Sequence, residues 1–186
     1  MEAAAELIAE RGWGRVTTRA VAERAGVPHG SVSYHFRGKQ ELLTEAALHA
    51  FQQAVPIEEF AALATVDDLI GLIAAEVGDP DAIDSVLSRL MLEAMREAAR
   101  DPPLRERMGA MLGQYRRLIV ETVRAEQGRG AVFGGAPPEA IAILLGAVGD
   151  GLLLHVLLDP ELDTTAAIEA LRSLLAEREP KSPSSS

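Results

Sequence analysis

The chain has 186 residues, no cysteine and a formal net charge of −10. The lack of cysteine excludes disulfides and thiolate chemistry, and no basic-then-apolar signal segment opens the chain, so a cytoplasmic location is predicted. Only 4% of the residues are aromatic, and the apolar content is mostly Ala, Leu, Val and Ile. Because Ala and Leu favour helices while strand-forming aromatics are scarce, the composition predicts an all-α fold.

The charge is unevenly distributed along the chain. Residues 11–39 contain one acid, Glu23, and six positive side chains, a net charge of +5. These positive side chains are Arg11, Arg15, Arg19, Arg24, Arg37 and Lys39. The other 157 residues therefore carry −15. This imbalance indicates either a short segment that binds a polyanion or a helical surface on which charges happen to cluster, and charge alone does not separate the two.

Local signals near the N-terminus predict four helices. Their expected ranges are 2–10, 19–25, 28–35 and 39–54. Thr17 stands at the N-cap position of the second helix, and Gly26 ends that helix because glycine readily adopts a positive φ. Pro28 suits the first turn of the third helix, where its missing N–H costs nothing.

Helical periodicity continues beyond Pro56 in five further segments, about nine helices in all. The expected ranges are 66–78, 81–100, 103–127, 137–158 and 164–178, separated by Pro- and Gly-containing stretches. Residues 180–186 are polar and rich in Ser and Pro, which predicts a disordered tail.

Residues 17–36 have the layout of a helix-turn-helix, with Gly26-Val27-Pro28 as the turn. The second helix is too short and polar for a core helix, since only Val32 and Phe36 are placed to face inward. Its other face presents hydrogen-bonding groups without strong positive charge: His29, Gly30, Ser31, Ser33, Tyr34 and His35. Such a face is typical of a surface that reads base edges while nearby arginines and lysines bind phosphates, and a merely solvated polar face is the alternative.

The N-terminal segment resembles the TetR family of bacterial regulators over about fifty residues without a gap. The residues that carry the resemblance are Ala4 through Arg11, Gly12-Trp13, Thr17, Arg19, Val21 through Val27, Gly30-Ser31-Val32, Tyr34-His35-Phe36 and Lys39 through Leu43. The family pattern places an aromatic after the glycine that follows helix 1, Ser or Thr at the start of helix 2, and an Ala-Gly-Val turn before the recognition helix.

The resemblance implies a role for each matched polar residue. Thr17 and Arg19 are expected to contact phosphates at the start of helix 2, and Lys39 at the start of helix 4. Major-groove contacts are expected from Pro28, His29, Gly30, Ser31 and Ser33, and sugar-phosphate contacts from Tyr34 and His35. Val21, Ala25, Val27, Val32, Phe36 and Leu42 are expected in the core.

Two departures from the family pattern bear on DNA affinity. Family members usually have a longer helix 1 preceded by basic residues, whereas this sequence starts at Met1-Glu2. Either the natural N-terminus lies upstream or a basic arm is missing. Ser33 occupies a position where an aromatic is frequent in the family, so a base preference does not transfer to this chain.

The segment 137–158 is apolar on nearly all sides, which predicts burial on all sides. Asp150 and three glycines interrupt it, so a membrane span is the disfavoured alternative. Burial against a second subunit fits better, with 164–178 completing a four-helix interface. The expected dimer residues are Leu145, Val148, Gly149, Leu152, Leu153, Val156, Ile168, Leu171, Leu174 and Leu175. A two-fold dimer spaces its recognition helices about 34–36 Å apart and reads a palindrome.

The remaining helices are expected to surround an effector pocket for a small apolar or amphipathic molecule. Candidate wall residues are Phe60, Met91, Met95, Met111 and Tyr115, because methionine adapts to irregular cavities. Plain core packing is the competing interpretation for methionines at helical spacing. The predicted domains are therefore residues 1–54, a helix-turn-helix domain whose fourth helix connects from about 39, and residues 55–179, an effector-binding and dimerisation domain.

These features predict a homodimeric repressor that is released from operator DNA by a small molecule. A transcriptional activator of the same family and a helical interaction module without DNA binding are the alternatives. An enzyme is not expected, because the four histidines lack a metal-binding or catalytic motif around them. No metal or cofactor is expected.

Overall fold

The computed structural model describes residues 1–83, 85–131 and 135–176. Every regular element in these ranges is a helix, as the composition predicts. The chain divides into two compact units. The first comprises Met1–Phe60 and Pro80–Tyr115, and the second comprises Ala61–Asp79 and Arg116–Ser186. Residues 80–115 thus group with the N-terminal helices, and the tail predicted at 180–186 lies outside the described residues.

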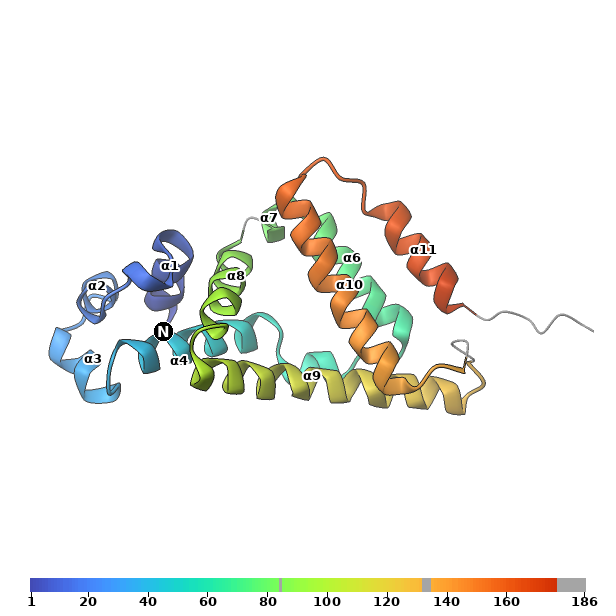
Figure 1. The fold of residues 1–186 in the computed structure, drawn as a ribbon, viewed down its shortest axis with the longest axis horizontal. Helices are drawn as coiled ribbons and strands as arrows, with labels where there is room; N and C mark the ends of the chain where they lie inside the picture. The colour runs from blue at the N-terminus through green and yellow to red at the C-terminus, as the bar shows by residue number, and fades with distance from the viewer. Residues whose placement is uncertain (84, 132–134, 177–186) are drawn as a thin grey trace, which may run out of the picture. The chain divides into compact units, whose positions relative to one another are not determined.

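The four N-terminal helices confirm the predicted ranges to within one or two residues. They are α1 (Glu2–Arg11), α2 (Thr18–Arg24), α3 (His29–His35) and α4 (Lys39–Ala54), with a 3-10 turn η1 (Trp13–Arg15) between α1 and α2 (Figure 1). Leu7 and Ile8 of α1 are fully buried, as is Leu43 of α4. The N-cap prediction for α2 is confirmed, because the Thr17 hydroxyl accepts a 3.1 Å hydrogen bond from the Ala20 N–H.

The turn between α2 and α3 is a Schellman motif. Gly26 has φ +67°, its N–H donates to the Glu23 carbonyl, and the Val27 N–H donates to the Ala22 carbonyl. This arrangement projects Val27 outward, with 42% of its surface exposed, and Ala25 is exposed too. The expectation that Ala25 and Val27 belong to the core is therefore wrong, whereas Val32 is buried as expected.

The helix predicted over 81–100 is interrupted. The structure has α7 (Pro80–Ile83) and α8 (Val86–Ala98) instead, and a short α5 (Ile57–Ala61) that the periodicity did not indicate. Ser85 adopts an extended conformation, and its hydroxyl accepts a 3.1 Å hydrogen bond from the Ser88 N–H. Ser85 therefore caps the start of a new helix.

Helix α9 (Pro102–Gly128) corresponds to the helix predicted over 103–127. In the first unit its residues Leu104, Met108, Met111 and Tyr115 join the core formed with α1, α4 and α8. Leu90 of α8 is fully buried in the same core. The first unit is therefore a helix-turn-helix whose supporting core extends into α8 and α9.

The second unit is organised around α6 (Val66–Gly78), which packs against α10 (Pro138–Leu158) and α11 (Thr165–Leu175) (Figure 1). Thr65 and Asp68 form a capping box that begins α6. The α6 side chains Leu69 and Ile70 are buried, and the Arg172 Nε donates a 2.6 Å hydrogen bond to the Asp67 carboxylate. This ion pair ties α11 to the start of α6.

Helix α10 is long and apolar enough to cross a membrane by length and composition. One of its faces nevertheless packs against α6, where the Ile73 side chain lies 3.4 Å from the position a Cβ would take at Gly149. Asp150 lies within the helix, and burial raises the pKa of its carboxyl group. Burial and the charge of Asp150 also raise the pKa of Glu76 on α6. These contacts place α10 in a helical bundle.

We predict opposite effects on stability from two Gly→Ala substitutions in the helix-turn-helix. Gly26→Ala should lower the free energy of unfolding by about 1 kcal/mol, because an L side chain is strained at φ +67°. Gly30→Ala should raise it by roughly 0.5–1 kcal/mol, because Gly30 is helical and has open space around its Cα. Urea unfolding followed by circular dichroism measures both, and equal effects would contradict the assignment of Gly26 to the turn.

Candidate nucleic-acid interface

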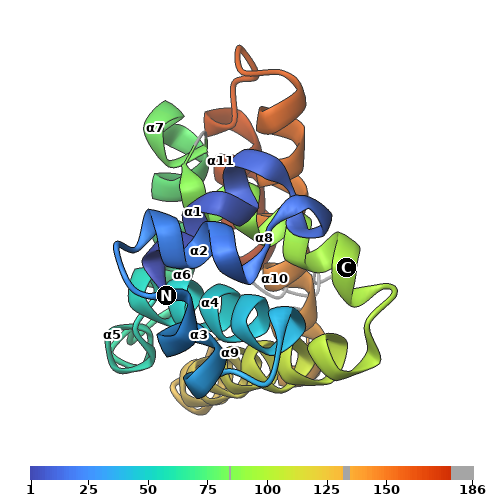
Figure 2. The ribbon, with the colours of Figure 1, turned by 90° about the vertical axis from the view of Figure 1, so that its left-hand side faces the viewer.

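Helix α3 presents a polar outer face. Tyr34 is 86% exposed, and every other residue expected to face DNA on this segment is exposed as well: Pro28, His29, Gly30, Ser31, Ser33 and His35. Val32 is 7% exposed and Phe36 is partly buried, so these two side chains fix the helix to the core. Figure 2 shows α3 beside α2 and α4. The structure thus brings the predicted base-reading residues together on one accessible surface.

The start of α2 adds groups suited to a phosphate. Thr17 and Arg19 are exposed, and the helix N-terminus directs free backbone N–H groups and a partial positive charge outward. The hydroxyl oxygen of Thr18 on α2 lies 3.2 Å from the Nε2 atom of His29. This hydrogen bond connects the first turns of α2 and α3, and it orients the His29 ring.

Lys39, a predicted phosphate ligand, also makes a hydrogen bond within the protein. Its ammonium donates a 2.7 Å hydrogen bond to the Gly14 carbonyl, and the side chain is partly buried. An ammonium group has three donors, so this bond leaves others available. Three further exposed cations belong to the positive segment, although the sequence predicted no individual role for them: Arg11, Arg15 and Arg37.

Two glutamates of α1 form ion pairs with Arg24 and neutralise its contribution to the positive surface. Its guanidinium pairs with Glu6 at 3.0 Å and with Glu10 at 2.7 Å. The hydrogen bond to Glu10, followed by the one to Glu6, holds the pKa of Arg24 above its usual value, and the same contact lowers the pKa of Glu10. Arg24 therefore links α2 to α1.

Four of the five predicted effector residues belong to the core of the first unit. Phe60, Met91, Met111 and Tyr115 pack in one cluster, whereas Met95 is 41% exposed. The Tyr115 hydroxyl donates a 2.5 Å hydrogen bond to the Val55 carbonyl. Its ring meets the rings of Phe51 and Phe60 edge to face, with centroids 5.3 and 5.1 Å apart.

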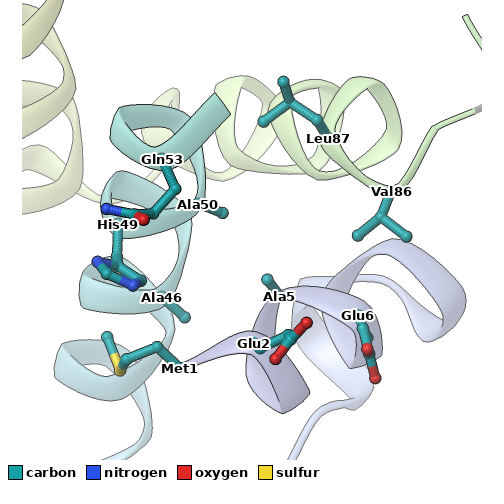
Figure 3. A pocket seen from close by; sticks show the side chains of 10 residues that line it. All are labelled: Met1, Glu2, Ala5, Glu6, Ala46, His49, Ala50, Gln53, Val86 and Leu87. Carbon is teal, nitrogen blue, oxygen red and sulfur yellow. The ribbon is translucent and has the colours of Figure 1, made fainter. Parts of the chain in front are cut away.

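A cavity of about 460 Å³ lies elsewhere in the first unit, between α1, α4 and α8 (Figure 3). Its lining is Met1, Glu2, Ala5, Glu6, Ala46, His49, Ala50, Gln53, Val86 and Leu87. None of the predicted effector residues lines it. No sequence pattern indicated this cavity, because its wall combines small, polar and apolar residues from three separate segments.

The predicted dimer residues divide between the inside and the outside of the second unit. Leu145, Val156 and Ile168 are buried within the chain, and Gly149 faces α6. Val148, Leu152, Leu153, Leu171 and Leu175 are partly buried, and Leu174 is 77% exposed. The exposed apolar side chains of α10 are Ile143, Leu144, Leu154 and Leu158 instead. A helix that is apolar all round gave no indication of which side would pack against α6.

The described residues contain no group of three or more His, Cys, Asp or Glu side chains arranged to hold a metal ion. The polar groups that gather at α2 and α3 are hydroxyl, imidazole and arginine side chains. These groups are suited to binding phosphates and base edges.

Comparison with known proteins identifies the two parts of the chain. Residues 1–46 match the family described as bacterial regulatory proteins, tetR family, and residues 67–178 match the BetI-type transcriptional repressor C-terminal family. The HTH-type transcriptional repressor Rv1474c of Mycobacterium tuberculosis is 25% identical over 156 residues, which cover 84% of this chain and 79% of that protein.

Solved structures agree over nearly the whole length. The transcriptional regulator SCO7518 from Streptomyces coelicolor is 31% identical, with a TM-score of 0.71 over 93% of this chain and 94% of that one. A transcriptional regulator from Saccharomonospora viridis in complex with choline is 25% identical, with a TM-score of 0.73 over 95% of each chain. The chain therefore belongs to the TetR family of bacterial transcriptional regulators.

Proposed function

We propose that the protein is a homodimeric repressor that binds a palindromic operator and leaves it when a small molecule binds. The observation that carries the proposal is the accessible polar face of α3, fixed to the core through Val32 and Phe36. The M. tuberculosis relative is a repressor, and the C-terminal family is a repressor family, which favours repression over activation.

The exposed residues divide into two kinds of contact. Thr17, Arg19 and Lys39 are proposed to bind phosphates, with Tyr34 and His35 at the sugar-phosphate edge. Base edges are proposed to be read by Pro28, His29, Gly30, Ser31 and Ser33. Phosphate contacts give affinity for any duplex, whereas base contacts discriminate between sequences. Gly30 has open space around its Cα, so DNA can approach the backbone closely there.

We predict that the protein selects a specific duplex from a random-sequence library and that its affinity falls as the salt concentration rises. On the selected duplex, Tyr34→Ala should weaken binding roughly tenfold, a typical loss for one or two removed contacts. Gly30→Ala should also weaken binding, because its added Cβ occupies the space needed by the DNA. Fluorescence anisotropy measures the dissociation constants.

Arg117→Ala is the control for these variants, since Arg117 is an exposed arginine of α9 outside the positive segment. It should bind like the wild-type protein. Equal affinity of the wild-type protein for every duplex would contradict the proposed function. In a reporter strain, deletion of the gene should raise expression from the selected operator, and a fall would indicate an activator.

The proposed dimer surface lies on the exposed apolar side of α10. Leu144 is 62% exposed, Leu154 is 49% exposed and Leu158 is 79% exposed, while Leu174 on α11 is 77% exposed. Ile143, Leu144, Leu154 and Leu158 recur on one side of the helix at a helical spacing. Large apolar side chains that lack cover within a chain favour association with a second copy.

We predict that Leu144→Glu and Leu158→Glu convert the protein to a folded monomer, because a carboxylate is costly to bury in an apolar interface. Sedimentation velocity at micromolar concentration measures the change, and circular dichroism checks the fold. Val86→Glu, which alters a 48% exposed apolar residue of the first unit, should leave the dimer intact. Dimers that persist in both leucine variants would place the interface elsewhere.

An organic cation is the proposed class of effector. Phe51, Phe60 and Tyr115 bring three of the chain's seven aromatic side chains together. Burial, and after it the charge of Glu58, raise the pKa of Tyr115, so a carboxylate lies near the rings. Aromatic faces attract quaternary ammonium groups, and the S. viridis relative was solved with choline.

We predict that choline lowers operator affinity at least fivefold and raises the melting temperature, because it binds one conformation better than the other. Phe60→Leu should weaken the choline response, since it removes a ring from the cluster. Leu92→Met, a change at an exposed position of α8, should leave the response unchanged. Absence of any choline effect on melting or on DNA affinity would contradict this choice of effector.

A further inference from the structure

The connector between α1 and α2, residues 12–17, is held in place by contacts with other parts of the chain. Gly12 ends α1 with φ +80°, Trp13 follows with a side chain only 1% exposed, and the 3-10 turn then leads towards Thr17. Thr17 caps α2, the helix whose first turn carries the proposed phosphate ligands. The position of this connector therefore sets the position of the DNA-binding face.

Three hydrogen bonds from outside the connector hold it in place. The Trp13 indole Nε1 donates to the Gln40 side-chain oxygen at 2.8 Å, and Lys39 donates to the Gly14 carbonyl at 2.7 Å. Both partners are in the first turn of α4. The third bond comes from a different part of the chain, because the Trp13 backbone N–H donates to the Glu93 carboxylate of α8 at 2.9 Å.

Glu93 is held so that its carboxylate faces the connector. Its side chain is 24% exposed, and the same Oε2 atom accepts a 2.7 Å hydrogen bond from Arg96 one turn further along α8. A Cβ at Gly12 would lie 3.1 Å from this oxygen, so glycine leaves the space that the carboxylate occupies. A longer contact joins α4 to α8, because the Gln40 side-chain amide donates to the Glu97 carboxylate at 3.4 Å.

We propose that Glu93 is a positioning residue for DNA binding and that α8 controls the α1–α2 connector through its bond to Trp13. The inference rests on the DNA-binding function proposed above. Glu93 lies outside the helix-turn-helix and 80 positions from Trp13 along the chain. A carboxylate accepting from an N–H forms a strong, directional bond, so a shift of α8 by roughly 1 Å relative to α1 breaks it.

The test compares substitutions at Glu93 that keep or remove the acceptor near the Trp13 N–H. Glu93→Gln retains a side-chain oxygen at the same distance from the backbone, whereas Glu93→Asp keeps the charge but is one methylene shorter. We expect Glu93→Asp and Glu93→Ala to weaken binding to the selected duplex roughly tenfold, and Glu93→Gln to stay within about threefold of the wild-type protein. Anisotropy is measured at a temperature where circular dichroism shows each variant folded.

Fluorescence gives a second measurement that a general loss of stability would not change, because Trp13 is the single tryptophan of the chain. The emission of folded Glu93→Asp and Glu93→Ala should differ from that of the wild-type protein, and Glu93→Gln should match it. Arg100→Ala is the control, since Arg100 is an exposed cation just beyond the end of α8 and its removal leaves the Glu93, Arg96 and Trp13 contacts in place. It should bind DNA and fluoresce like the wild-type protein.

Wild-type affinity in folded Glu93→Asp would overturn the proposal, as would a loss in Glu93→Gln equal to that in Glu93→Asp. If Glu93→Ala does not fold, the comparison of the Asp and Gln variants decides the question. A wild-type protein that selects no duplex would contradict the proposed function itself. If the wild-type protein binds the selected duplex and the Glu93→Asp variant binds it equally well, only the role of Glu93 is contradicted.

Discussion

The first unit depends on the packing of α1 against both α4 and α8. Leu7 and Ile8 of α1 are buried at 1% and 0% exposure, and they share one core with Leu43 of α4 and Leu90 of α8. Close packing of this kind makes a core sensitive to the displacement of any one helix. The helix-turn-helix is therefore continuous with α8 and the first half of α9, which explains why residues 80–115 group with the N-terminal helices.

The proposed DNA-binding face contributes little to its own stability. Helix α3 has seven residues and supplies one buried side chain, Val32. Its place is set by the Schellman turn at Gly26, by the bond between Thr18 and His29, and by the partly buried ring of Phe36. Because neighbouring segments provide this support, the outer positions of α3 are free to carry hydrogen-bonding side chains.

Local signals made the N-terminal helices predictable, while long-range contacts did not have a signal in the sequence. Thr17 and Gly26 act within a few residues, so they marked helix ends correctly, and Ser85 caps α8 by an equally local contact. The Glu93 contact with Trp13 joins segments 80 positions apart. The side of α10 that packs against α6 was also hidden, because uniform apolarity carries no directional information.

The pairing of Arg24 with Glu6 and Glu10 has a consequence for how such a protein searches a genome. A cation already neutralised within the protein adds little attraction to the phosphates of arbitrary duplexes, and the remaining acidic surface repels them. Contacts to base edges are unaffected by this neutralisation. Under the proposed function, fewer molecules are then retained on the vast excess of unrelated DNA, so a smaller number of copies is enough to occupy one operator.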